Sequence, residues 1–231
     1  MFPSPSYLLP GHHPTVIPYD TNTTIVPAIK LLVQASKENI ALRNVPEFAF
    51  DVVEITRQLL ANRFIDVYAR LVNIFNSSTA SQVCAAGKPL LDILDDVETL
   101  LATNENYLLS TWIADARQWA HGDASYAAYL EYNARNQITL WGPDGEINDY
   151  ASKQWSGLVG GYYKARWEAF VSYLCELKEN ATAYNATLVA QNMLAIGKAW
   201  DQQILGQRFG EVSGTKGNTF AVVEIILRRW G

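Results

Sequence analysis

The 231-residue chain has little basic charge, few cysteines and no long apolar run. It carries 18 lysines and arginines against 23 aspartates and glutamates, and its longest basic run is Arg228-Arg229. The lack of a basic patch argues against nucleic-acid binding, which depends on lysine and arginine contacts to phosphates. Apolar runs such as Val222-Val223 are only a few residues long, whereas a membrane span needs about 20 apolar residues. We therefore expect neither nucleic acid nor a membrane as a partner.

Only two cysteines are present, Cys84 and Cys175. Both lie in apolar segments with helical spacing, which favours two buried free thiols, although a disulfide between them remains open because spacing cannot decide it. No Cys-X-X-Cys pair or cysteine–histidine cluster suggests a structural zinc site. His12 and His13 lack a third ligand at a suitable spacing, so we interpret them as an exposed loop pair. No metal is predicted.

The common catalytic motifs are also missing, among them GxSxG, GxGxxG, the P-loop and HExxH. One group of carboxylates attracts notice, because paired acids can hydrolyse glycosides. These acids share a single predicted helix, so we interpret them as its solvated face; they are Asp92, Asp95, Asp96 and Glu98. The segment from Asp144 to Asp149 lacks the glycine and glutamate positions of a calcium loop. Residues alone therefore predict no catalytic group and no cofactor.

Apolar residues recur at helical spacing along most of the chain, and alternating strand patterns are nearly absent. We predict an all-α fold, a bundle of about eight helices with short connections. Asp123 is expected to cap one helix, and Asn148 or Asp149 another. The helices are expected at about 25–36, 46–75, 80–101 with Pro89 as a kink or break, 105–120, 123–141, 149–163 and 166–178 as two helices or one continuous helix, 187–206 and 219–229.

Five prolines before residue 21 exclude a helix there, so we predict an extended arm over residues 1–21 and a helical domain over 22–231. Four Asn-X-Ser/Thr sequons lie in polar or helix-end segments and predict N-glycosylation at Asn22, Asn76, Asn180 and Asn185. The N-terminal segment nevertheless lacks the basic and apolar regions of a signal peptide. The sequons indicate a protein of the secretory pathway, but the N-terminal segment does not resemble a signal peptide. We therefore expect an incomplete chain.

Two blocks of sequence are more specific than these patterns. The first, from Tyr132, reads YNARNQITLWGPDG and continues from Ile147 as INDYASKQWSGLV; the second, from Phe50, reads FDVVEITRQ. In order and spacing they closely resemble the C-terminal domain of α-N-acetylglucosaminidases, glycoside hydrolase family 89. The resemblance covers the chain from about Tyr19 to its C-terminus.

The resemblance implies a role inside a larger enzyme. Members of this family cleave terminal α-linked N-acetylglucosamine, notably from heparan sulfate in lysosomes, with two glutamates of a TIM-barrel domain. The helical domain packs on that barrel and helps to close the sugar pocket. By resemblance, the partners are therefore the parent's catalytic barrel and, through it, an N-acetylglucosamine glycan. The location is lysosomal, vacuolar or secreted. No catalytic residue is carried over to this chain.

Individual residues take expectations from the same resemblance. The family has a Trp-Tyr pair near the pocket before its first helix, and here Pro18-Tyr19 stands in that place. Tyr19 is thus either a sugar-contacting residue or an anchor of the arm. The signature residues are expected to fix the turn and its helix pair by packing and hydrogen bonds; they are Arg135, Trp141, Tyr150 and Lys153.

Three functional readings follow. The first is a piece of a glycosidase that is inactive alone and carries an apolar face for its barrel. The second is a free-standing helical module that binds a carbohydrate or a protein without catalysis. The third, an active enzyme with an unrecognised site, would need a pocket with paired carboxylates.

Overall fold

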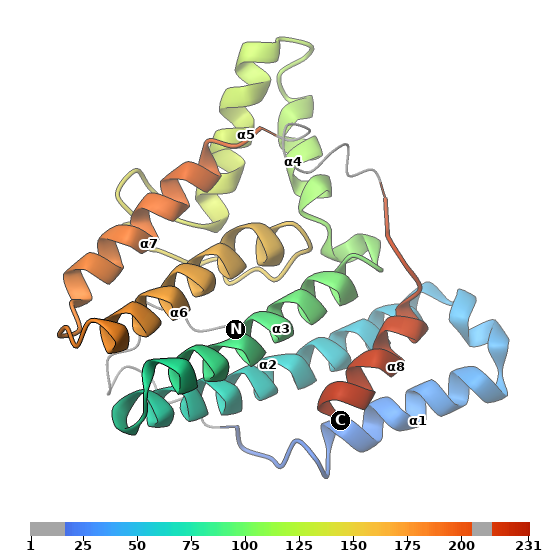
Figure 1. Cartoon of the computed structure of the whole chain (residues 1–231). Coiled ribbons are helices and arrows are strands. Elements are labelled where there is room, and N and C mark those ends of the chain that lie inside the picture. The colour runs from blue at the N-terminus through green and yellow to red at the C-terminus, as the bar shows by residue number, and fades with distance from the viewer. Residues whose placement is uncertain (1–16, 205–213) are drawn as a thin grey trace.

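The computed structural model describes residues 17–204 and 214–231, and it confirms the all-α prediction. Over that part of the chain there are helices and loops, with one isolated bridge between Leu108 and Ser156. Figure 1 shows the helices, which are α1 (Ile25–Glu38), α2 (Pro46–Ser77), α3 (Ala80–Leu101), α4 (Leu109–Gln118), α5 (Ala124–Ile138), α6 (Lys164–Glu179), α7 (Ala186–Asp201) and α8 (Thr219–Trp230). The histidine pair and most of the arm lie outside the described residues.

Local sequence sets most helix ends where we expected them. Pro46 opens α2, because its missing N–H would have no partner in the first turn anyway. The Asp123 carboxylate caps α5 by accepting from the N–H groups of Ser125 and Tyr126. Pro89 lies inside α3 without dividing it.

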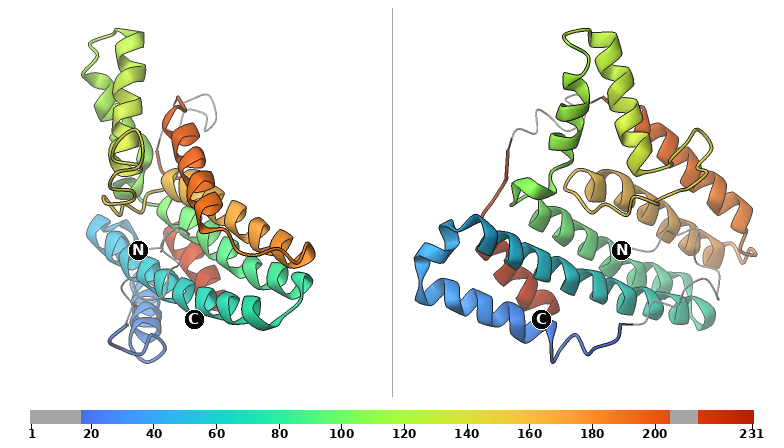
Figure 2. Two further views of the ribbon diagram at one scale, coloured as in Figure 1. Left: turned by 90° about the vertical axis from the view of Figure 1, so that its left-hand side faces the viewer. Right: turned by 180° about the vertical axis from the view of Figure 1, so that it is seen from behind.

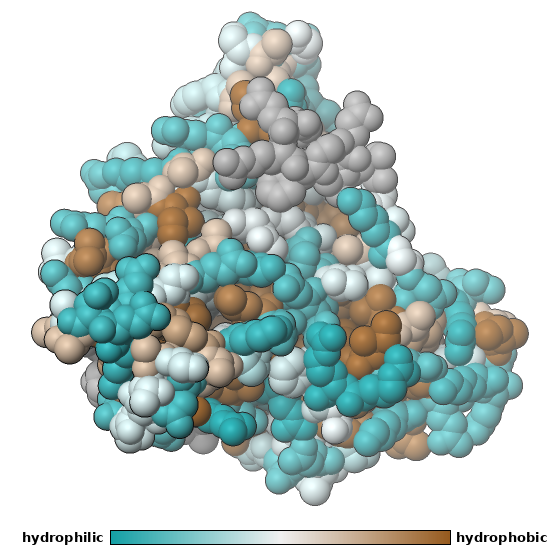
Figure 3. Space-filling model, viewed as in Figure 1, coloured by the Kyte–Doolittle hydropathy of each residue, from teal (hydrophilic) through white to brown (hydrophobic). Residues whose placement is uncertain are grey.

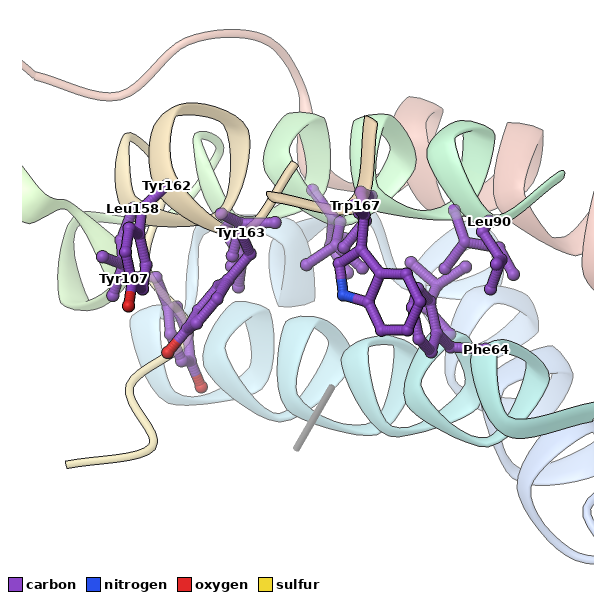
Figure 4. Close-up of a cluster of buried hydrophobic side chains, with 14 of the residues drawn as sticks. Phe64, Leu90, Tyr107, Leu158, Tyr162, Tyr163 and Trp167 are labelled. Carbon is purple, nitrogen blue, oxygen red and sulfur yellow. The ribbon is translucent and has the colours of Figure 1, made fainter. Parts of the chain in front are cut away.

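The long helices α2 and α3 run side by side at the centre of the bundle, with α6 packed on α3 and with α1 and α8 on α2 (Figures 1 and 2). Between α2 and α6 the core is aromatic. Trp167 is only 1% exposed, and its ring lies 5.0 Å from that of Phe64 (Figure 4). The Phe170 ring lies 5.8 Å from that of Trp167. Burying such rings is the main force that holds amphipathic helices together.

The helices α4 and α5 form a hairpin that projects from this bundle (Figure 2). In the view of Figure 3, apolar residues lie in patches separated by hydrophilic ones. Among the described helices, none is long and apolar enough to cross a membrane.

The favoured interpretation of the cysteines as free thiols was wrong. Cys84 of α3 and Cys175 of α6 form a disulfide, with their Cα atoms 5.5 Å apart. The two residues are 91 positions apart in sequence and meet because α3 packs on α6. Sequence spacing carries no information on that contact.

Three predicted helices also differ from those observed. The helix expected at 187–206 ends at Asp201. The segment expected to be helical from residue 105 contains a short 3-10 turn, Glu105–Tyr107, before α4 begins at Leu109. The helix expected from residue 149 is absent. Residues 149–151 form a turn, residues 152–155 have no regular secondary structure, and a π-helical turn, Val159–Tyr163, then leads into α6.

Candidate functional site: the signature loop

The loop between α5 and the π-helical turn, residues 139–158, contains most of the signature sequence, and we call it the signature loop. Three of its non-glycine residues have positive φ: Trp141 at 54°, Asp149 at 61° and Ser152 at 51°. L-residues adopt this conformation rarely, and it persists only where surrounding contacts enforce it. Such concentrated strain marks the loop as a candidate functional site.

Aromatic and aliphatic side chains of the loop point outward. Trp141 is 37% exposed and Tyr150 68% exposed, and their rings meet edge to face with centroids 5.4 Å apart. Ile147, also on the loop, is 47% exposed. A rigid backbone thus presents apolar surface to the outside, which suits contact with a sugar face or a protein partner.

A buried carboxylate anchors the start of the loop. Asp201, at the end of α7, accepts hydrogen bonds from the Thr139 hydroxyl at 2.7 Å and the Asn136 amide at 2.9 Å. The Asn136 side chain also bonds both backbone groups of Gly142, at 2.8 and 3.0 Å. Burial raises the pKa of Asp201, and the two hydrogen bonds offset only part of that effect. The turn beside Trp141 is therefore tied to α7.

A buried ion pair anchors the middle of the loop. Both oxygens of Asp149 accept from the Arg166 guanidinium of α6, at 2.8 and 2.9 Å, and Tyr162 donates to the same carboxylate at 3.0 Å. Burial strongly raises the pKa of Tyr162, so its hydroxyl stays protonated as a donor. The prediction that Asp149 caps a helix is therefore wrong. Its carboxylate instead fixes the loop to α6.

Arg135 lies beneath the loop and is fully buried. Its guanidinium donates to Glu131, one helical turn earlier, at 2.8 and 3.0 Å, and stacks 4.5 Å from the ring of Trp200. Glu131 also accepts from Arg117 of α4 at 2.7 Å. These contacts join α4, α5 and α7, and they place Arg135 in the junction that supports the loop.

The acidic cluster on α3 is not simply a solvated face. Glu98 closes the end of the loop by accepting from the Ser156 hydroxyl and the Gly157 and Gly160 N–H groups, each at 2.7 Å. A Cβ atom at Gly160 would lie 2.9 Å from the Glu98 Cγ, so a larger residue there would displace the Glu98 side chain. The other acids are paired with cations: Asp92 with Lys88, Asp95 with Lys164, and Asp96 with Arg229.

The structure brings Tyr19 near the same part of α2 that contacts the loop. Arg57 donates to Gln154 of the loop at 2.8 Å, and Asn62 donates to the Tyr19 hydroxyl at 3.4 Å. Those two α2 residues are about 8 Å apart along the axis at 1.5 Å per residue. Tyr19 is 37% exposed, so its ring remains available for contact.

The remaining predicted residues are placed as follows. Lys153 lies 5.5 Å from the ring of Trp155, and its carbonyl accepts from Tyr163 at 3.0 Å. The four sequon asparagines are all exposed. Among the described residues there is no cluster of three or more potential metal ligands.

Sequence reasoning missed the polar residues beneath the loop, above all Arg166 and Asp201. A signal for Arg166 exists, since it shares a helical face with Tyr162 and Phe170. A basic residue on an apolar stripe predicts a buried charge that needs a partner. No comparable signal marks Asp201, because its partners, Asn136 of α5 and Thr139 of the loop, lie more than 60 positions away in the sequence.

Comparisons with known proteins agree with this architecture. Residues 4–229 match the family described as the α-N-acetylglucosaminidase C-terminal domain. Human α-N-acetylglucosaminidase is 31% identical over 161 residues, which are 69% of this chain and 22% of the human one. The chain thus spans about a fifth of that relative's length.

Solved structures give the same result. A family 89 glycoside hydrolase from Clostridium perfringens, in complex with PUGNAc, has a TM-score of 0.82 and 25% identity, covering 94% of this chain and 24% of that one. The same bacterial enzyme in complex with its substrate GlcNAc-α-1,4-galactose also gives a TM-score of 0.82 and 25% identity, with the same coverage.

Proposed function

The chain belongs to the α-N-acetylglucosaminidase C-terminal domain family, and from this premise we propose that it packs on the catalytic barrel of a family 89 glycoside hydrolase and helps to shape the sugar pocket. The catalytic domain is then its partner within the larger enzyme. The observation that carries the proposal is the signature loop, which is strained, anchored from below and exposed through Trp141 and Tyr150.

The loop has the properties that a pocket wall requires. An aromatic ring presents a flat apolar face to the C–H groups of a pyranose, and its position must be fixed for the contact to be selective. Asp149 and Asp201 fix it from two helices, α6 and α7. We propose that Trp141 and Tyr150 contact the terminal N-acetylglucosamine or the barrel segments next to it, with Ile147 filling the space beside them.

The chain alone is proposed to be inactive. Glycoside hydrolysis uses two carboxyl groups that flank the scissile bond, and in barrel enzymes these groups come from the strand ends of the barrel. Here three acids of the loop or beside it are engaged in structural contacts, Asp149 with Arg166, Asp144 with Lys198, and Glu98 with backbone N–H groups. Glu146, also in the loop, accepts from the Asp144 N–H. We further propose a lysosomal, vacuolar or secreted location, a route that the four exposed sequons support.

The test compares this chain alone with a hybrid in which it replaces the matching domain of human α-N-acetylglucosaminidase. A chromogenic α-N-acetylglucosaminide should be hydrolysed by the hybrid and not by the chain. In the hybrid, Trp141→Ala should lower kcat/KM by about two- to tenfold, as expected for a ring contact of about 0.5–1.5 kcal/mol.

Trp119→Ala is the matched control, because Trp119 is 72% exposed at the tip of the α4–α5 hairpin. It should leave kcat/KM unchanged. Turnover by the chain alone would refute the assignment of catalysis to the barrel. An unchanged kcat/KM in the Trp141→Ala hybrid would refute the pocket role of the loop.

The hairpin favours a second candidate function, a binding module that acts without a barrel. Tyr126 and Tyr129 of α5 stack with centroids 6.2 Å apart and are 47% and 58% exposed. Binding of a glycan by the isolated chain, abolished by Tyr129→Ala and unaffected by Trp141→Ala, would favour this candidate over the first.

A further inference from the structure

Three of the four sequons lie at one end of the bundle. Asn76 lies in the last turn of α2, Asn180 follows α6 and Asn185 precedes α7. Figures 1 and 2 place the α2–α3 turn and the α6–α7 turn at the same end of the molecule in every view. A contact joins them, since the Lys178 ammonium lies 4.7 Å from the ring of Phe75.

Side-chain contacts and a hydrogen bond order the surface that the two turns form. Tyr184, in the α6–α7 turn, packs against Tyr173 with centroids 5.8 Å apart, and the Tyr173 hydroxyl accepts from the Asn185 N–H at 2.7 Å. All three sequon asparagines are nevertheless exposed. The Asn185 Oδ1 caps α7 by accepting from Leu188 at 3.0 Å, which leaves its Nδ2 directed elsewhere. No hydrogen bond of the described residues uses the Nδ2 of any of the three.

This end is remote from the signature loop, as three helices show independently. The loop contacts α2 at Arg57, α6 at Arg166 and α7 at Lys198. At 1.5 Å per residue, the sequon on each helix lies about 20–28 Å along the axis from that contact. The loop and the three sequons therefore occupy opposite ends of the same helices.

We propose that Asn76, Asn180 and Asn185 carry N-linked glycans that together cover the end of the bundle farthest from the signature loop. In this reaction the asparagine Nδ2 forms a bond to the anomeric carbon of an oligosaccharide supplied as a lipid-linked diphosphate. The lipid diphosphate leaves and one amide proton is released. Bulky, hydrated glycans keep their surroundings in solvent, so this end stays free of other protein domains.

Asn22 is a separate case, because it lies before α1 and its Oδ1 accepts from Arg63 of α2 at 2.5 Å. A glycan there would not contribute to the cover.

The first measurement is site occupancy. The full chain is expressed with an added secretion leader in a eukaryotic host, and peptide N-glycosidase in ¹⁸O-water labels every occupied asparagine for mass spectrometry. Each of the three sites should be occupied in most molecules. Ser78→Ala, Thr182→Ala and Thr187→Ala should each remove one glycan without changing the asparagine, whereas Ala186→Ser preserves its sequon and should change nothing.

Glycans are transferred before the protein is exported. Site occupancy can therefore also be measured on protein that is retained inside the cell. Less than half occupancy at any of the three sites would overturn the three-glycan cover.

The second measurement tests coverage. Tyr184 is 44% exposed and Tyr150 68% exposed in the bare protein. Glycans should lower the chemical labelling of Tyr184 severalfold relative to the enzymatically deglycosylated chain and leave that of Tyr150 unchanged. Equal protection of both tyrosines, or of neither, would contradict the proposal. Occupancy and labelling need no catalytic barrel, so this inference and the proposed function can fail separately.

Discussion

The helical core around Trp167 and the signature loop differ in what holds them. In the core, apolar side chains interlock between α2, α3 and α6, and Trp167 contacts Phe64 and Phe170. In the loop, several residues have unfavourable backbone conformations. Asp149 attaches this backbone to α6, and Asp201 attaches it to α7. The core hides its aromatic rings, while the loop exposes them.

The difference indicates a division of labour. Apolar packing is tolerant and provides stability, whereas buried charge pairs contribute little net stability but define one geometry. A wall of a binding pocket needs fixed geometry and exposed surface, and the loop has both. Both contributions can be measured as changes in the free energy of unfolding of the isolated chain.

The strongest test of the core is Trp167→Ala. The indole is 1% exposed and surrounded by rings, so its removal should cost about 3–5 kcal/mol in urea unfolding followed by circular dichroism. Trp119→Ala, at an exposed position, should stay within about 0.5 kcal/mol of wild type. Similar losses at both positions would erase the contrast between buried and exposed rings.

Arg166→Met tests the loop anchor. It leaves Asp149 buried without its cation, which should cost about 3 kcal/mol or more. The double variant Arg166→Met/Asp149→Asn should recover much of this loss, because the buried charge is gone. If the double variant is as unstable as the single one, packing rather than charge holds the loop.

Removal of the disulfide is expected to have an intermediate effect. The double variant Cys84→Ser/Cys175→Ser removes the cross-link between residues 91 positions apart. It should lower the free energy of unfolding by about 2–4 kcal/mol. A reducing agent should lower the urea midpoint of the wild-type chain and leave that of the double variant unchanged. Equal midpoints for oxidised and reduced wild type would contradict a stabilising role.

A smaller effect concerns pH. Burial raises the pKa of Asp201 in the folded chain above its ordinary value of 3.8, so the folded state holds this proton more tightly than the unfolded state. The stabilising contribution is then complete below that ordinary value and is lost as pH rises through the folded pKa. Compared with wild type, Asp201→Asn should lose less stability, or gain more, as pH rises from about 4 to 7, read as the difference between the two urea midpoints at each pH. A difference that changes with pH in the opposite direction would show that the sign is wrong.

The smallest change is expected for Tyr150→Ala. With 68% of its surface exposed, this residue should contribute no more than about 0.5 kcal/mol to unfolding. A loss above about 2 kcal/mol would mean that the loop's rings serve the fold, and the comparison between core and loop would fail.

The regular part of the fold could be predicted from the sequence because its signals are local. Apolar periodicity and capping residues gave the limits of α2 and α3 within a residue or two. The disulfide and the Asp149–Arg166 pair could not be predicted, since each depends on a contact between helices. The helix expected at residue 149 was wrong because Asp149 and Gly157 have positive φ, at 61° and 92°, and neither value is helical.

For the candidate site, the sequence singled out Trp141 and Tyr150 through family resemblance alone. Composition could not show that these rings are exposed, nor that Arg135 lies buried beneath them at 0% exposure. Exposure depends on how α5, α6 and α7 converge.

The most direct test of the account asks which face of this domain meets the catalytic barrel. A photoreactive phenylalanine would replace Tyr150 in one hybrid enzyme and Tyr184 in another, and cross-linked peptides would be identified by mass spectrometry. The account predicts cross-links to the barrel from position 150 and none from position 184. Cross-links to the barrel from position 184, with none from position 150, would contradict it.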